Sequence, residues 1–248
     1  MVLADPAECR NSAGIFSVTD CSVMVSERLT EIYQLLFRRF GPQHWWPGET
    51  QFEIIVGAIL TQNTNWGNVE KAISNLKAAG LLTPKRLHDI EVSELAELIR
   101  PAGYFNIKAK RLKNFISWLF ENYDGKLSEL ENVDTERLRA ELLGIKGVGR
   151  ETADSILLYA LDREIFVVDA YTARVAFRHG LIEPEADYEQ LRELFQSHLP
   201  PEVKMFNEYH ALLVRVGKEF CKPKARCAGC PLEKLPHEVE EQVVSRDQ

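Results

Sequence analysis

The sequence predicts an all-α protein, and three observations lead to that prediction. Apolar residues recur three and four positions apart along most of the chain, which is the spacing of one face of an α-helix. No stretch keeps the period-two alternation of a half-buried strand, and no Asn-Gly or Asp-Gly pair joins two β-branched runs. With 248 residues and 45% hydrophobic content, the chain can bury the core of one large domain or of two small ones.

The composition limits the classes of function. The formal net charge is −7, so a nucleic-acid binder of this composition must gather its positive charge locally. No apolar run reaches the ~18 residues of a membrane span, and no basic region followed by an apolar stretch opens the chain, so we expect neither a membrane segment nor a secretory signal. Three of the five cysteines cluster near the carboxyl end, which favours a metal site in a reducing, cytoplasmic compartment over disulfides.

The amino-terminal part contains a loose extension, a helix and a tryptophan pair. Residues 1–25 mix Asp, Pro, Asn, Ser and Gly without a clear period. An apolar stripe that includes Leu29, Ile32 and Leu36 predicts the first helix. The adjacent Trp45 and Trp46 cannot both face a core from one helix, so they either plug a domain seam or line a pocket for a flat ligand.

Several further helices are predicted in the middle of the chain. The stretch from Phe52 to Leu60 is apolar nearly all round, as in a buried helix, and it ends in the polar run 61–66, which can be a capping turn. The residues that indicate ends, caps and breaks of the next helices are Gly80, Thr83, Pro84, Pro101 and Asn106. A basic run at 108–113 is expected to be a solvated helix face.

A glycine-rich turn separates two helices within 134–160 and is the most informative stretch of the chain. Gly147 and Gly149 precede the second helix, where free N–H groups and the positive end of the helix dipole attract an anion such as a DNA phosphate. Lys146 and Arg150 flank these glycines and are expected to contact the same phosphate. An ordinary helical corner would also explain the turn.

The position of Asp169 adds specificity. It follows Glu151 by eighteen residues, within Phe166-Val167-Val168-Asp169-Ala170-Tyr171. Together with the hairpin, this pattern resembles the helix-hairpin-helix, Gly/Pro-rich loop and catalytic aspartate of the endonuclease III superfamily of DNA glycosylases, over roughly residues 27–235. An aspartate here would also cap the helix expected at 171–178.

The resemblance implies two helical subdomains with the active site in the cleft between them. One is expected to comprise 26–48 and 163–236 with the cysteine loop, the other to be a helical barrel at 49–162, and 237–248 to be an acidic tail. Family members flip a damaged base out of double-stranded DNA and hydrolyse its N-glycosidic bond. The resemblance therefore implies a monomeric repair enzyme associated with the nucleoid.

The same resemblance assigns roles to individual residues. Asp169 would stabilise the oxocarbenium-like sugar and orient or deprotonate water, and Gln62 or its neighbour Asn63 would enter the duplex as a wedge. Strand-cutting members carry a lysine where this chain has Glu151, and a glutamate cannot form an imine. Lys146 is a poor substitute, so the resemblance implies a monofunctional glycosylase without lyase activity.

The aromatic residues suggest a base. Trp45, Trp46 and Trp66, with Gln62-Asn63-Thr64, resemble the 3-methyladenine DNA glycosylase III branch. N-alkylated purines are cationic, and aromatic faces attract cations by roughly 0.5–2 kcal/mol. The alternatives are a glycosylase for uracil, mismatched thymine or oxidised pyrimidines, and a non-catalytic helix-hairpin-helix DNA-binding module with a metal clip.

The cysteine cluster, Cys221-x5-Cys227-x2-Cys230, resembles the [4Fe–4S] loop of the family, which has four cysteines. The fourth would fall near Pro236, next to His237, so His237, Cys9 or Cys21 could replace it, or the cluster could be lost. The basic residues expected to contact the DNA backbone from this loop are Lys222, Lys224 and Arg226.

Overall fold

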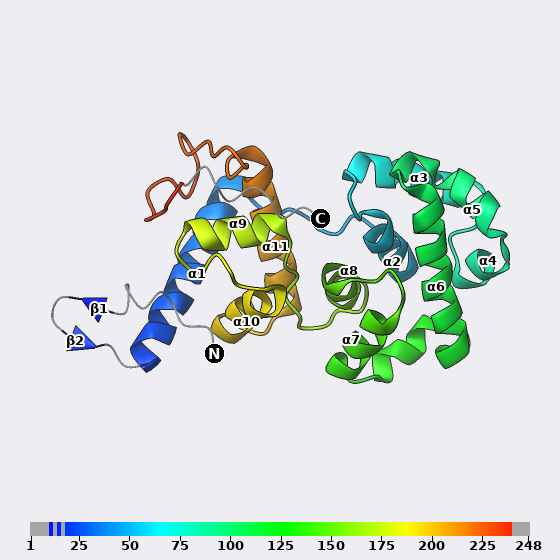
Figure 1. Ribbon diagram of the computed structural model, residues 1–248, viewed down its shortest axis with the longest axis horizontal. Coiled ribbons are helices and arrows are strands. Elements are labelled where there is room, and N and C mark those ends of the chain that lie inside the picture. The colour runs from blue at the N-terminus through cyan, green and yellow to red at the C-terminus, as the bar shows by residue number, and fades with distance from the viewer. Residues whose placement is uncertain (1–9, 12–13, 16–17, 240–248) are drawn as a thin grey trace. The chain divides into compact units, whose positions relative to one another are not determined.

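The computed structural model describes residues 10–11, 14–15 and 18–239. The chain forms two compact units (Figure 1). The terminal unit comprises Met1–Trp45 and Glu164–Gln248, and the middle unit comprises Trp46–Arg163. The sequence placed these divisions at 48/49 and 162/163, within a few residues of those in the structure. Of the expected acidic tail at 237–248, residues 240–248 lie outside the described residues.

The middle unit is entirely helical. Its elements are α2 (Gln51–Leu60), α3 (Trp66–Ala78), α4 (Pro84–Asp89), α5 (Val92–Leu98), η1 (Arg100–Ala102), α6 (Phe105–Tyr123), η2 (Leu127–Asn132), α7 (Thr135–Gly144), α8 (Arg150–Ser155) and the π-helical turn η3 (Ile156–Ala160). Helix α2 is buried along nearly its whole length, as its apolar sequence predicts, and packs against α3, α6, α8 and η3. The long helix α6 contacts α2, α4 and α5 (Figure 1).

Local sequence explains the ends of several of these helices. The hydroxyl of Thr83 accepts a hydrogen bond from the backbone N–H of Arg86, and Pro84 occupies the first turn, as predicted. Gly80 follows α3 with φ +66°, a conformation that glycine adopts without strain. Helix α6 instead begins at Phe105, so the prediction that Asn106 caps it is wrong. Tyr104 precedes the helix in a left-handed conformation and makes no side-chain cap.

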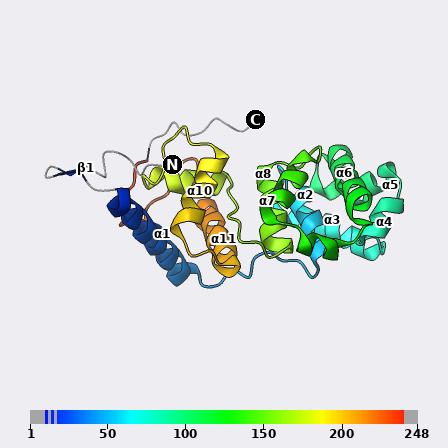
Figure 2. The same ribbon diagram turned by 90° about the horizontal axis from the view of Figure 1, so that it is seen from below.

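In the part of the terminal unit that the structure describes, there are four further helices. They are α1 (Val18–Phe40), α9 (Ala170–Arg178), α10 (Tyr188–His198) and α11 (Val203–Glu219). Helix α11 packs against both α9 and α1, and α1 also contacts α10 (Figure 2). Leu29, Ile32 and Leu36 are fully buried, which confirms the apolar stripe predicted for the first helix.

Two features of the amino-terminal stretch differ from the expected loose extension at 1–25. Helix α1 already begins at Val18. Further along it, Val25 is buried and the Ser26 hydroxyl donates to the backbone carbonyl of His198 at the end of α10. In addition, β1 (Arg10–Asn11) pairs antiparallel with β2 (Gly14–Ile15). These two-residue strands were not predicted, but the fold class is all-α as expected. Within the described residues, no helix is both long and apolar enough to cross a membrane.

Candidate functional site

The hairpin turn lies between α7 and α8. Gly149 is the N-cap residue of α8 and supplies no side-chain cap. Gly147 adopts φ +99°, and a Cβ atom built there would collide with Cγ of Arg111. Only glycine satisfies both constraints at position 147. Lys146 and Arg150 are exposed beside this turn, where a phosphate could reach them.

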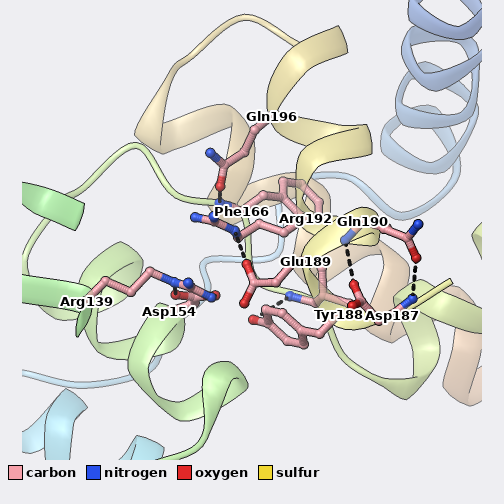
Figure 3. A network of polar contacts seen from close by, with 10 residues as sticks. Arg139, Asp154, Phe166, Asp187, Tyr188, Glu189, Gln190, Arg192 and Gln196 are labelled. Carbon is pink, nitrogen blue, oxygen red and sulfur yellow. Dashed lines mark hydrogen bonds and ion pairs between the residues drawn. The ribbon is translucent and has the colours of Figure 1, made fainter. Parts of the chain in front are cut away.

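A buried ion pair joins the two helices of the hairpin. Arg139 on α7 donates from Nε to Oδ1 of Asp154 on α8 at 2.6 Å, and from Nη2 to Oδ2 at 3.1 Å (Figure 3). A bidentate pair of this kind fixes orientation as well as distance. Glu151 is exposed on the first turn of α8, where a negative charge is favourable beside the helix dipole. The sequence analysis did not predict the ion pair.

Gln62 is tied to the hairpin. Its Nε2 donates to the carbonyl of Gly147 at 3.1 Å and to the hydroxyl of Thr152 at 2.8 Å, and its Oε1 accepts from Nη1 of Arg111. Asn63, in contrast, is exposed and has φ +53°. Of the two predicted wedge residues, Asn63 is therefore the one that the turn after α2 presents to solvent, while Gln62 holds that turn against the hairpin.

An aromatic cluster in the middle unit contains two of the three predicted pocket residues. Trp46 meets Trp66 edge to face, with ring centroids 5.2 Å apart, and lies 5.2 Å from the ring of Tyr159 on η3. A Cβ atom at Gly57 would lie 3.1 Å from Nε1 of Trp46, so the indole packs closely on α2. Tyr159 was not predicted. Trp45 is half-buried and belongs to the terminal unit.

Asp169 is the N-cap of α9, which confirms the predicted capping role. Its Oδ1 accepts from the Thr172 backbone N–H at 2.8 Å and from the Thr172 hydroxyl at 3.0 Å. Its Oδ2 lies 3.6 Å from Nε2 of His210 on α11, and both side chains are nearly buried. Burial alone would raise the pKa of the Asp169 carboxyl, but His210 and the bonds from Thr172 outweigh it and hold that pKa below its usual value.

Neighbouring elements of the terminal unit fix the position of Asp169. The backbone N–H of Phe166 donates to Oε1 of Gln196 on α10 at 2.9 Å (Figure 3). A Cβ atom at Gly217 would collide with the ring of Tyr171, so α9 and α11 approach closely only because position 217 is glycine. This close packing sets the separation of Asp169 from His210, a residue that the sequence analysis missed.

The three clustered cysteines line one hollow in the terminal unit. Nη1 of Arg178 lies 3.3 Å from Sγ of Cys221, and Nε of Arg174 donates to the Cys221 carbonyl at 2.7 Å. Burial raises the pKa of the Cys230 thiol, and the nearby Cys221 and Cys227 add to this effect. The three thiols line one hollow, and the guanidinium that donates to Sγ of Cys221 would stabilise a thiolate, the form in which cysteine binds a metal.

Among the described side chains, no three His, Cys, Asp or Glu converge where one metal ion could sit. Around the hollow, Lys224 and Arg226 are exposed and Lys222 is half-buried.

Comparisons with known proteins agree with this geometry. Residues 56–201 match the model of the HhH-GPD superfamily base excision DNA repair proteins. A Methanocaldococcus jannaschii protein, provisionally named a DNA repair glycosylase, is 52% identical over 84% of this chain and 96% of its own length. Endonuclease III of Sulfolobus acidocaldarius is 30% identical over 72% of this chain and 78% of that protein.

Solved structures show the same fold. The Helicobacter pylori 3-methyladenine DNA glycosylase bound to 1,N6-ethenoadenine aligns with a TM-score of 0.67 and 31% identity, covering 79% of this chain and 97% of that one. An endonuclease III–DNA complex aligns with a TM-score of 0.73 over 85% of this chain and 94% of that one, at 22% identity. The second alignment is evidence for the fold alone.

Proposed function

The chain belongs to the HhH-GPD superfamily and is a base excision DNA repair glycosylase, and we propose that it excises alkylated purines from double-stranded DNA. We further propose that it acts as a monomer and leaves the strand uncut. The observation that carries the choice of base is the cluster of Trp46, Trp66 and Tyr159. Its rings offer electron-rich faces to a cationic purine. The likeness to a 3-methyladenine DNA glycosylase solved with 1,N6-ethenoadenine supports the same choice.

The hairpin is the proposed grip on DNA. The amides around Gly147 and Gly149 would bind a backbone phosphate, with Lys146 and Arg150 adding charge. Gln62 holds the neighbouring turn in place through its bonds to the hairpin. The exposed Asn63 would enter the duplex when the base is flipped out. On the cysteine loop, Lys222, Lys224 and Arg226 would contact the backbone as well.

Asp169 is the proposed catalytic carboxylate. Its lowered pKa keeps it ionised at neutral pH, so its charge can stabilise the oxocarbenium-like sugar as the base departs. Because Oδ1 accepts both bonds from Thr172, we assign the sugar and the attacking water to Oδ2, which lies 3.6 Å from Nε2 of His210. A purine alkylated at N3 or N7 is cationic and leaves as a neutral base, so little acid catalysis is needed at the leaving group, whereas an uncharged base such as 1,N6-ethenoadenine must gain a proton as it leaves.

The absence of strand cleavage is proposed from the residues near the hairpin. Glu151 stands at the position of the nucleophilic lysine in strand-cutting relatives. Burial lowers the pKa of Lys108 to about 8, so its amine loses a proton more easily than that of an ordinary lysine, and only the neutral amine can form an imine. However, it is buried, and its Nζ donates to the carbonyls of Leu60 at 2.8 Å and Ala102 at 2.7 Å, so we assign it no chemistry.

We also propose that the cysteine loop holds a [4Fe–4S] cluster through Cys221, Cys227 and Cys230. When bound, such a cluster would fix the loop that carries the three basic residues. The hydrogen bond from Arg178 to Sγ of Cys221 would stabilise negative charge on the sulfur.

A base-release assay tests the proposed function. Matched duplexes carrying 1,N6-ethenoadenine, 7-methylguanine, uracil opposite guanine or an oxidised pyrimidine are incubated with excess enzyme, and abasic sites are scored after alkali. We expect release of the alkylated purines only, intact strands before alkali, and no borohydride-trapped complex. Release of uracil or the oxidised pyrimidine alone would overturn the choice of base, and trapping would overturn the monofunctional assignment.

A substitution in the aromatic cluster tests the pocket itself. Trp66→Leu should slow excision of the alkylated purine by about two- to thirtyfold, because it removes a ring face worth roughly 0.5–2 kcal/mol to a cation. Trp66→Phe should retain most of the rate. Tyr104→Leu is the matched control, because Tyr104 is a 68% exposed aromatic residue of the same unit. Equal rates for the leucine variant and wild type would refute the aromatic pocket.

A further inference from the structure

The hollow that holds the three thiols is also lined by two histidines. His179 and His237 both border it, with ring centroids 5.6 Å apart. A four-iron cluster needs a ligand for each iron, and the three cysteines supply only three. Imidazole replaces cysteine on one of the irons in Rieske centres, so a histidine is a competent substitute. The residues that line the hollow therefore include a donor for each of the four irons.

The hydrogen bonds of both rings define their tautomers. Nδ1 of His237 lies 2.8 Å from the carbonyl oxygen of Leu235, and Nδ1 of His179 lies 3.1 Å from that of Pro236. A carbonyl oxygen only accepts hydrogen bonds, so Nδ1 carries the proton in each ring and the lone pair is on Nε2. A metal-bound histidine commonly has this arrangement, with the distal N–H donated to a backbone carbonyl.

The backbone on each side of His237 is fixed to the end of α9. Pro236 accepts the bond from His179, and the backbone N–H of Glu238 donates to the carbonyl of Arg178 at 2.8 Å. The same Arg178 donates to Sγ of Cys221. Residues 178 and 179 thus hold the segment that carries His237 against the rim of the thiol hollow.

This arrangement gives the two histidines different roles. His179 is buried at the end of α9 and uses its ring to hold Pro236, so it is a positioning residue. The ring of His237 is hydrogen-bonded within its own turn. We infer that Nε2 of His237 is the fourth ligand of the cluster, in place of a fourth cysteine beside Cys221, Cys227 and Cys230. This inference rests on the cluster proposed above.

The inference is tested on full-length protein purified anaerobically and reconstituted with iron and sulfide. Iron and sulfide content, the visible absorption spectrum and electron paramagnetic resonance are measured for wild type, His237→Ala, His237→Cys and His179→Asn. Wild type and His237→Cys should hold about four irons per chain. His237→Ala should fall to about three, with the resonance of an oxidised three-iron cluster. His179→Asn keeps a donor for Pro236 and should retain about four.

The outcomes separate this inference from the proposals on which it rests. Four irons and an unchanged spectrum in His237→Ala would overturn the ligand assignment but leave the cluster standing. Loss of iron in His179→Asn but not in His237→Ala would transfer the role to His179. A colourless wild type without iron, or one zinc per chain, would overturn both the cluster and its fourth ligand. Base release is assayed separately, so failure of the glycosylase proposal would not be confused with any of these results. His44→Ala is the control for nonspecific loss of iron, because His44 is exposed and distant in sequence from the three cysteines.

Discussion

Replacing Asp169 by asparagine separates its capping role from its proposed chemical role. Asparagine can accept the two bonds from Thr172 through its amide oxygen, and asparagine and aspartate are comparable N-caps, so folding should be nearly unaffected. The change removes one negative charge beside the developing sugar cation. At an effective dielectric constant of about 20, two unit charges about 4 Å apart interact by about 4 kcal/mol. The expected loss is therefore about a thousandfold in the rate of base release.

The assay for Asp169→Asn is single-turnover excision from a duplex with one alkylated purine, at saturating enzyme. Asp187→Asn is the matched control, because Asp187 caps α10 in the same unit by accepting from the backbone N–H of Gln190 at 2.9 Å. The control should keep the wild-type rate, and both variants should keep the wild-type melting temperature and affinity for the lesion. A rate for Asp169→Asn within tenfold of the control would show that Asp169 is only a cap.

The remaining predictions concern the hairpin and the buried lysine. Gly147→Ala should lower the free energy of unfolding by about 2 kcal/mol, because alanine resists a positive φ. Gly149→Ala should fold normally, because this residue has φ −94° and open space around it. In a binding titration it should weaken affinity for all duplexes alike. Glu151→Lys should gain slow strand cleavage and detectable borohydride trapping on a gel; no trapping would show that the position lacks access to the sugar. The lowered pKa of Lys108 means that the folded state binds this proton less tightly than the unfolded state. Denaturant unfolding should therefore show wild type gaining stability relative to Lys108→Met as pH rises from about 8 to 10.5, whereas the exposed control Lys110→Met should show no such trend.

Much of the middle unit follows from local sequence rules. The apolar run of α2 predicts a buried helix, and Thr83 with Pro84 marks the start of α4, because caps and helical periods depend only on residues a few positions apart. The same rules failed at Asn106, because the N-cap of α6 is the left-handed Tyr104, two residues earlier than predicted. Helix α1 also begins at Val18, within a stretch that has no convincing period in the sequence.

The prediction that residues 108–113 form a solvated face is wrong for Lys108, which is buried. The signal was present, because Lys108 lies four residues before Leu112 and eight before Ile116, on the apolar stripe of α6. His210 is likewise four residues after Phe206 and three before Leu213 on the buried face of α11. A polar residue on an apolar stripe predicts burial with a specific partner. The partner itself, such as the Leu60 carbonyl or Asp169, is distant in sequence and could not be identified from the period.

Asp169, proposed for chemistry, and the hairpin proposed to bind a DNA phosphate belong to different compact units. Asp169, Thr172 and His210 are all in the terminal unit, and the close packing of α9 on α11 at Gly217 arranges them without any residue of the middle unit. A carboxylate held in this way loses little freedom when the base leaves, and preorganised charge is an effective source of rate enhancement. The hairpin and the turn at Gln62 are held together within the middle unit by their own hydrogen bonds. Substitutions that weaken the hairpin should therefore reduce DNA affinity without altering the ionisation of Asp169. Substitutions at His210 should do the converse: they should alter the pH dependence of the rate of base release and leave the affinity for undamaged duplex unchanged.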